Sequence, residues 1–496
     1  MNHFTSAWIW TLFRSVLLVC LALPWCGLMV RWIRASQGWK RSLQWSLMSI
    51  PFLFPELLTG YAYSQMTRLL ITDAWTREFW FDLLLFFRIV PVGTGLWYCS
   101  PPSPLSREAI HVRVLAIRPE VSSIRRIGIL CWYQLQGPAR MTLFAGAGLF
   151  LVIFQEFELA SLLAVRSWTV WLFDAQVEGL PQWDSLKYVV LPALCTWLIC
   201  GSLPWWVVGQ HRESAELTSR PSPMSARVQA SLWLYLVLAC ALIAIYPFCL
   251  MGLETAQGLS ALVYNWVHLR GLMEGILIAG GLALIAAVVS DLAAEVLVAQ
   301  FPPRGWKRIA LVGVSCGLAG PLAIGLTLLS LFQQPGLISW RETTIPALCG
   351  LVVWLLPRAV VLQGIRRTLR SPIAEHAATL LSAAPDFQRQ IAARRVQWLI
   401  RDRGQFAARV VLFHWAYWEL TIPSLLNPAG LISAPVRLYI DAHFARNAIL
   451  TAKACIMLLA PVLVLLSCWC LMRMIRAARQ RQPRQTTSAS HNLHRH

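Results

Sequence analysis

Long apolar stretches alternate along the chain with shorter polar and basic segments. A stretch of about 20 apolar residues is long enough to cross the hydrocarbon core of a bilayer as a helix. The sequence therefore predicts an all-α polytopic membrane protein. The eleven predicted membrane-spanning helices are 7–30, 45–70, 79–98, 140–164, 187–208, 229–252, 272–297, 308–332, 345–363, 406–426 and 448–472.

Prolines lie inside two of these apolar stretches. Pro51 and Pro55 fall in the second stretch, and Pro346 and Pro357 fall in the ninth. A proline removes a backbone donor and clashes with the preceding turn, although membrane helices tolerate it where neighbours satisfy the backbone. We therefore expect both of these helices to be broken.

Composition agrees with a membrane protein, because 57% of the 496 residues are hydrophobic and only 13% are charged. Soluble domains are charged at about a quarter of their positions. The net charge of +20 comes mainly from one alternate set of loops, which holds 30 of the 43 Lys and Arg residues, whereas the other set holds seven. Basic residues accumulate on the cytoplasmic side. The sequence thus predicts a multi-pass inner-membrane protein with its N-terminus outside and its C-terminus in the cytoplasm.

The basic balance does not favour nucleic acid as a partner. Nucleic-acid binding would call for a soluble basic module with exposed aromatic residues, and the sequence contains no such module. Lys and Arg in cytoplasmic loops instead meet anionic lipid, so membrane lipid is the expected partner of these loops.

Two distant segments of the chain have similar sequences. FQEFELASLL at 154–163 aligns without gaps with YWELTIPSLL at 417–426, and the alignment pairs Glu156 with Glu419. Internal repeats of a helical bundle are typical of transporters, in which the pathway lies between the repeats. By our topology the two copies run in the same direction, which predicts a parallel repeat.

The similarity continues beyond these segments. WTVWLFDA at 168–175 resembles PVRLYIDA at 435–442, and a long, Arg-rich inner loop precedes each copy, at 99–139 and at 364–405. The chain is therefore predicted to consist of two related halves and a tail. Their boundaries are 1–210 for the first half, 225–472 for the second half and 473–496 for a basic, disordered tail.

Four ionisable side chains in the predicted spans are candidates for a translocation path: Glu156, Glu158, Glu419 and His414. Charged groups inside a membrane are costly and commonly functional, and a histidine can relay a proton. The alternative interpretation makes the acids structural, paired with Arg166 or Arg437, and makes the histidine a packing residue.

Other charged residues also lie in or near the predicted spans. Asp291 and Glu295 are four residues apart on one helix face, where they form either a wet interfacial surface or a cation site. Basic side chains near helix ends are interpreted as snorkelling towards water. These are Arg14, Arg68, Arg88 and Arg358.

An enzyme is not indicated by the sequence. It contains no G-x-x-x-x-G-K-[ST], H-E-x-x-H or G-x-S-x-G motif, so it predicts no ATPase site of its own and no metal or cofactor. The 13 cysteines lie mostly in apolar stretches without a C-x-x-C motif, and we interpret them as buried thiols.

One inner loop carries a recognisable motif, EHAATLL at 375–381. Together with FQEFELASLL and the following WTVWLFDA, it resembles the permease subunits of binding-protein-dependent ABC importers. The most similar branch is that of the fused two-half permeases of the iron(III) and thiamine type. The resemblance implies a type I permease fold, in which the two inner loops are coupling loops. The residues matched to these loops are Glu375, Ala377, Ala378 and Ser382 in the second loop and Glu108, Ala109 and Gly128 in the first.

The resemblance also implies partners and a substrate class. Two separate ATPase subunits would dock on the coupling loops, and an extracytoplasmic binding protein would deliver iron(III), thiamine or a similar small solute. The sequence departs from the family at Ser382, where the family has Gly, and at Ile110, which follows Glu108-Ala109 in place of the second Ala. These departures leave a second interpretation open, a transport-inactive membrane scaffold or sensor. A lipid-modifying enzyme would need a His/Asp/Glu cluster at one membrane face, which the sequence does not display.

Overall fold

A computed structural model of the chain describes residues 2–70, 73–100, 129, 133, 139–200, 224–299, 313–369, 372–383, 387–443 and 447–481. Within these ranges the chain forms helices joined by turns, and no strand is present. The predicted all-α fold class is therefore confirmed for the described part of the chain. The apolar, outward-facing surfaces of the helices agree with a multi-pass membrane protein.

The part of the chain predicted as the first half contributes eight described helices. They are α1 (Asn2–Ala35), α2 (Gly38–Leu53), α3 (Glu56–Leu70), α4 (Ala74–Cys99), α7 (Ala139–Phe154), α8 (Glu158–Leu162), α9 (Trp168–Val177) and α10 (Gln182–Cys200). Helices α1, α4 and α7 pack against one another and form the centre of this half.

The part of the chain predicted as the second half begins with a long helix that has no counterpart among the described residues of the first. Its described elements are α12 (Ala226–Cys240), the π-helix η1 (Ala241–Ile245), α13 (Tyr246–Tyr264), α14 (Trp266–Ala299), the 3₁₀ turn η2 (Gly317–Ala319), α16 (Pro321–Leu331), α17 (Ile338–Arg341), α18 (Ile345–Leu369), α19 (Pro372–Ser382), α20 (Phe387–Gln397), the π-helix η3 (Trp398–Asp402), α21 (Arg403–Trp418), α22 (Thr421–Leu426), α23 (Ala434–His443) and α24 (Asn447–Arg481). Here α14, α18 and α21 pack together as α1, α4 and α7 do in the first half.

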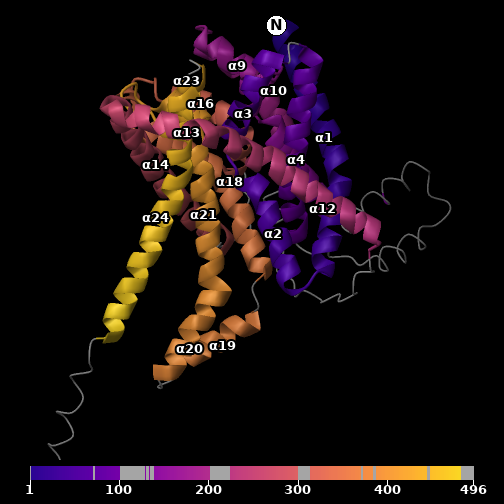
Figure 1. Ribbon diagram of the computed structural model, residues 1–496, viewed down its shortest axis with the longest axis vertical. Helices are drawn as coiled ribbons and strands as arrows, with labels where there is room; N and C mark the ends of the chain where they lie inside the picture. Colours follow the sequence, from indigo (N-terminus) through magenta and orange to yellow (C-terminus); the bar gives the residue numbers. More distant parts are fainter. Residues whose placement is uncertain are drawn as a thin grey trace, which may run out of the picture.

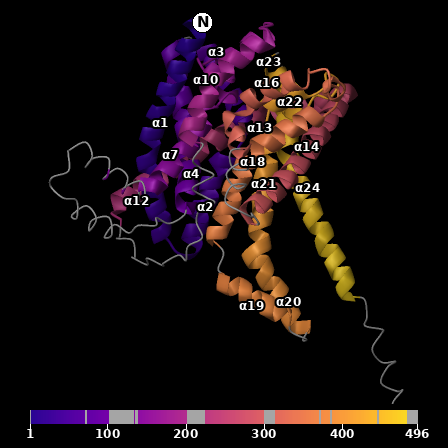
Figure 2. The same cartoon turned by 180° about the vertical axis from the view of Figure 1, so that it is seen from behind.

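The two ends of the bundle differ (Figures 1 and 2). The N-terminus lies at one end, together with α9 and α23, whereas α19 and α20 project from the other end. Helices α12 and α13 cross the bundle obliquely, and they contact α2 and α4 of the first half and α24 of the second. This oblique helix therefore joins the two halves.

Fewer helices are continuous spans than the hydropathy pattern predicts. Six described segments are long and apolar enough to cross a membrane, or seven if the pair 313–319 and α16, bent by 111°, counts as one span. One of the six, 140–162, comprises α7, α8 and the short break between them. The predicted spans 45–70, 140–164, 308–332 and 406–426 each contain a break. Hydropathy alone misses these breaks, because a broken helix buried among other helices can be as apolar as a straight one.

The two proline-containing spans behave differently. The span at 45–70 breaks at Pro55 as predicted, between α2 and α3, whereas α18 continues through Pro357, so that prediction is wrong. Pro357 cannot donate to the Val353 carbonyl, and Gly317 packs directly against that carbonyl. A Cβ atom at Gly317 would lie only 2.2 Å from the Val353 oxygen.

Carbonyls released by prolines also join helices elsewhere. A proline leaves the carbonyl four residues earlier without its helical donor, and in lipid such a group must find another partner. Pro51, Pro91, Pro247 and Pro461 release four such carbonyls. Their donors are Cys240 Sγ to Leu47 (3.3 Å), Tyr235 Oη to Phe87 (3.1 Å), Thr59 Oγ1 to Ile243 (3.1 Å) and Tyr417 Oη to Met457 (3.3 Å). Three of these bonds attach the oblique helix to the first half.

Replacing Tyr235 with phenylalanine should therefore destabilise the fold by about 0.6–1.5 kcal/mol, the usual worth of an interhelical hydrogen bond in a membrane protein. The measurement is the free energy of unfolding in mixed detergent micelles titrated with a denaturing detergent. Tyr264→Phe is the matched control, because the Tyr264 side chain is 93% exposed. Equal effects of the two changes would contradict the role given to the Tyr235 hydroxyl.

The predicted tail begins later than expected. Helix α24 continues from the last predicted span through Arg481, so the boundary at 473 lies inside a helix. Only 482–496 remain of the predicted disordered tail, and they lie outside the described residues, as do 101–128 of the first inner loop.

Candidate functional site

The helix breaks define the centre of the molecule. In the first half the chain breaks between α2 and α3 and again between α7 and α8. In the second half it breaks before α16 and between α21 and α22. Broken helices at membrane depth occur where protein buries them or where they line a water-filled cavity, and in transporters they commonly form the binding site.

Glu156 and Glu419 stabilise equivalent breaks. The Glu156 carboxylate accepts hydrogen bonds from the backbone N–H groups of Leu159 (2.6 Å) and Ala160 (3.0 Å). The Glu419 carboxylate accepts them from Thr421 (3.0 Å) and Ile422 (3.3 Å). Each acid therefore caps the short helix that follows it. The backbone, and not the predicted Arg166 or Arg437, supplies these partners.

A second pair of contacts repeats between the halves. A Cβ atom at Gly60 of α3 would lie 2.7 Å from the Leu162 side chain of α8, and one at Gly325 of α16 would lie 2.7 Å from that of Leu425 in α22. Leu162 and Leu425 are aligned in the sequence repeat. The two short helices thus pack on a glycine of a broken helix in the same way.

The breaks of one half contact those of the other. Gln155, in the break after α7, donates a hydrogen bond to the Leu318 carbonyl beside the break before α16. His414 of α21 lies beside the Leu53 carbonyl at the end of α2, and the neighbouring Trp415 ring lies 5.8 Å from that of Phe52. We call the region where these four breaks meet the break junction.

Charged side chains gather at the break junction. Arg88 of α4 holds the first break, since it binds Glu56 (2.7 Å) and the Phe54 carbonyl (2.8 Å). Glu158 lies within range of the charges of Glu56 and Glu419, and no hydrogen-bond or ion-pair partner is found for it among the described residues. Glu158 is therefore the carboxyl group of the junction that the described protein groups do not hold in place.

The prediction that the Arg358 side chain snorkels towards water is wrong. Its guanidinium donates to the Trp354 carbonyl (2.7 Å) and lies 4.1 Å from the centre of the Trp354 ring. It is also within range of the charge of Glu419. Arg358 and Arg88 thus place two positive charges beside the carboxylates. The Arg68 side chain lies outside the described residues.

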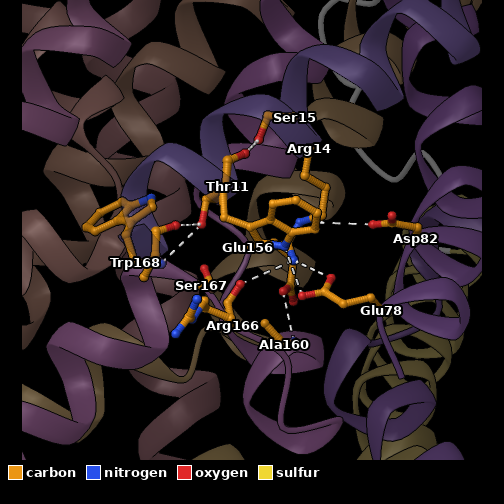
Figure 3. A network of polar contacts seen from close by, with 12 residues as sticks. Thr11, Arg14, Ser15, Glu78, Asp82, Glu156, Ala160, Arg166, Ser167 and Trp168 are labelled. Atoms are coloured by element: carbon orange, nitrogen blue, oxygen red, sulfur yellow. Dashed lines mark hydrogen bonds and ion pairs between the residues drawn. The ribbon is translucent and has the colours of Figure 1, made fainter. Parts of the chain in front are cut away.

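Arg14 does not snorkel either, because it is only 2% exposed. Its guanidinium binds Glu78 of α4 (2.9 Å) and the Arg166 carbonyl (3.3 Å), and it lies 4.0 Å from Asp82 (Figure 3). The Arg166 carbonyl belongs to the turn that precedes α9. Arg14 therefore ties α1, α4 and this turn together beside the Glu156 cap.

The Asp291 carboxylate is also held by side chains of neighbouring helices. It is 1% exposed, and it binds Arg409 of α21 (2.7 Å) and Gln363 of α18 (2.6 Å), with Arg366 at 3.6 Å. The nearby Glu295 pairs more loosely with Arg401, at 3.6 Å. For Asp291 neither alternative from the sequence holds, because arginines compensate it in a buried ion-pair network. The Glu295 side chain is 29% exposed, which agrees with a wet interfacial surface at that position. No group of three metal-binding side chains occurs among the described residues.

The second predicted coupling loop forms two helices. Glu375, Ala377 and Ala378 lie in α19, and Ser382 ends it, with its hydroxyl donating to the Thr379 carbonyl (2.7 Å). Ala378 is buried whereas Ala377 is exposed. The residues predicted for the first loop, Glu108, Ala109 and Gly128, lie outside the described residues.

Sequence reasoning missed the partners of most of these groups. Glu56, Arg88 and Arg358 come from helices distant in the sequence, so no local spacing links them. The pairing of Glu156 with Glu419, in contrast, was visible as a sequence repeat.

Comparison with protein-family models, with curated proteins and with solved structures finds no match to this chain.

Proposed function

We propose that this chain is a membrane permease, the transport subunit of an ABC importer that moves a small solute across the inner membrane. The observation that carries the proposal is the break junction, where four broken helices from two similarly built halves meet. Discontinuous helices at a repeat interface are the usual setting of a transport site. Rocking of one half against the other would open this junction to either side in turn.

The assignment to ABC importers rests on the resemblance at 375–381 and 154–163. The position of α19 and α20 supports it, because these helices project from the end of the bundle opposite the N-terminus (Figure 1). Arg394 and Arg395 of α20 are exposed there. In this proposal that end faces the cytoplasm, and two separate ATPase subunits dock on it and on the first coupling loop.

The break junction provides the path in this proposal. Glu156 and Glu419 hold the short helices in place, while Glu158 and His414 contact the solute or the water that accompanies it. Iron(III), thiamine or a similar small solute follows from the resemblance alone. An extracytoplasmic binding protein would select the solute and deliver it to the end that carries α9 and α23.

A specific observation favours a second candidate, a transport-inactive scaffold or sensor with the same fold. Ser382 stands where the family has a turn-forming glycine, and Ile110 stands where it has a small alanine. A small residue permits close approach of a docked subunit, so these changes weaken docking. The partners of the chain distinguish the two candidates.

The test is affinity purification of the chain from its native membrane, followed by mass spectrometry. The importer predicts an ATPase subunit at two copies per chain, together with a binding protein. Replacing Arg394, Arg395 and Arg403 with alanine should lower the recovered ATPase by at least fivefold, because these exposed cations lie on or beside α20.

The matched control removes three cations from the other end of the bundle, by Lys187→Ala, Arg270→Ala and Arg341→Ala. ATPase recovery should stay at the level of the unchanged chain in this control. Recovery of the chain without any ATPase, under conditions that preserve other ABC complexes, would favour the scaffold or sensor.

A further inference from the structure

The corner between α1 and α2 concentrates positive charge around one tyrosine. The guanidinium groups of Arg34 and Arg41 each lie 5.5 Å from the centre of the Tyr98 ring, and Arg41 also donates a hydrogen bond to the Tyr98 hydroxyl. Lys40 is adjacent in the sequence and exposed. Three cations thus occupy one exposed corner of the bundle.

These charges lack a carboxylate partner in the part of the chain that the structure describes. No ion pair is formed by Arg34, Lys40 or Arg41 among the described residues, whereas the less exposed Arg14 and Arg88 each bind an acid. Arg34 and Arg41 are close enough for their like charges to act on each other. Like charges held together in this way repel, and a bound anion would relieve the repulsion.

A row of exposed apolar side chains along α2, which we call the apolar track, begins at the same corner. Trp39 is 70% exposed, and Leu43, Ile50 and Leu53 of α2 are exposed along one side of the helix. Tryptophan is enriched at the level of lipid headgroups, and the exposed aliphatic residues follow at helical spacing. Cations below an apolar track match the headgroup and the acyl chain of one amphipathic molecule.

We propose that the corner formed by Arg34, Lys40 and Arg41 binds the phosphate of an anionic phospholipid, whose acyl chain lies along α2. Guanidinium and ammonium groups supply charge-assisted hydrogen bonds to the phosphate oxygens, and α2, which begins at Gly38, presents the positive end of its dipole to the same place. The lipid belongs to the leaflet at the end of the bundle that carries α19 and α20. The proposal does not depend on transport.

The experiment is a native mass spectrometry titration of the detergent-solubilised full chain with dioleoylphosphatidylglycerol and, separately, dioleoylphosphatidylcholine. The unchanged chain should prefer the anionic lipid. The variant R34Q/K40Q/R41Q should bind the anionic lipid at least tenfold more weakly and leave the weak binding of phosphatidylcholine unaltered. The variant R34K/R41K keeps the charges, so it should retain most of the preference and should fold even if the glutamine variant does not.

The matched control is R394Q/R395Q/R403Q, which removes the same number of exposed charges from the same end of the bundle. It should bind the anionic lipid as the unchanged chain does. Equal losses in the two triple variants would overturn the proposal, as would an unaltered affinity in R34Q/K40Q/R41Q. Competition by glycerol phosphate at the concentration at which the lipid saturates would assign the corner to a soluble phosphate and overturn its assignment to lipid.

Discussion

Replacing Asp291 with alanine is expected to destabilise the chain by about 3–5 kcal/mol, because removing one member of a buried ion pair leaves the other charge uncompensated. Asp291 is the common partner of Arg409, Gln363 and Arg366, which lie on two other helices. Its loss therefore removes the acid beside Arg366, whose side chain is buried, whereas Arg409 is partly exposed. The measurement is the free energy of unfolding in mixed micelles, with the helix content followed by circular dichroism.

A control on the same helix separates this effect from a general loss of charge. Glu274 of α14 pairs with Arg270 at 2.8 Å, but both side chains are more than half exposed. Glu274→Ala should therefore cost less than about 1 kcal/mol. If Asp291→Ala costs no more than this control, the network does not stabilise the second half.

Replacing Gly258 with valine is expected to separate α13 from α24, at a cost of about 3 kcal/mol. A Cβ atom at Gly258 would lie 1.6 Å from the Ala448 carbonyl oxygen, which is far inside van der Waals contact. Helices in lipid associate largely through such close packing at small residues. A larger side chain can be accommodated only if the two backbones move apart.

A cross-link can report this separation directly. The Thr255 hydroxyl lies 3.2 Å from the Cys455 sulfur, so the variant Thr255→Cys should form a disulfide with Cys455 on oxidation. Adding Gly258→Val should reduce the cross-linked fraction at least fivefold. Gly252→Val on the same helix is the control, because nothing lies within 4 Å of a Cβ atom there. A cross-link that survives Gly258→Val unchanged would contradict the close packing of α13 and α24.

Much of the fold could be predicted from hydropathy, because every predicted apolar stretch is mostly helical where the structure describes it, with short breaks in four of them. The breaks could not, with the exception of Pro55. The turn before α16 depends on Gly320, whose φ of +99° is open to glycine, but a glycine in an apolar stretch has no unique interpretation. The breaks after α7 and α21 carry glutamates, and the sequence shows a glutamate's position without showing that it caps a helix.

The roles of the charged residues also divide into those that the sequence predicted and those that it did not. The repeat identified Glu156 and Glu419 as equivalent, and the structure gives them equivalent backbone partners. Arg14 and Asp291 were misinterpreted because their partners, such as Glu78 and Arg409, lie 64 and 118 residues away. The spacing of residues along one helix shows which side chains share a face of that helix. It does not show which other helix packs against that face.

The carbonyls released by prolines have a consequence for how this sequence can change over generations. Pro91 and Tyr235 lie on different helices, yet the Tyr235 hydroxyl donates to the carbonyl that Pro91 leaves without a helical donor. Loss of the tyrosine leaves the buried Phe87 carbonyl without this donor, and loss of the proline restores the ordinary helical donor and leaves the hydroxyl redundant. The two positions, and likewise Pro461 with Tyr417, should therefore be inherited as linked pairs, with substitution of the proline opening the way for substitution of its distant donor.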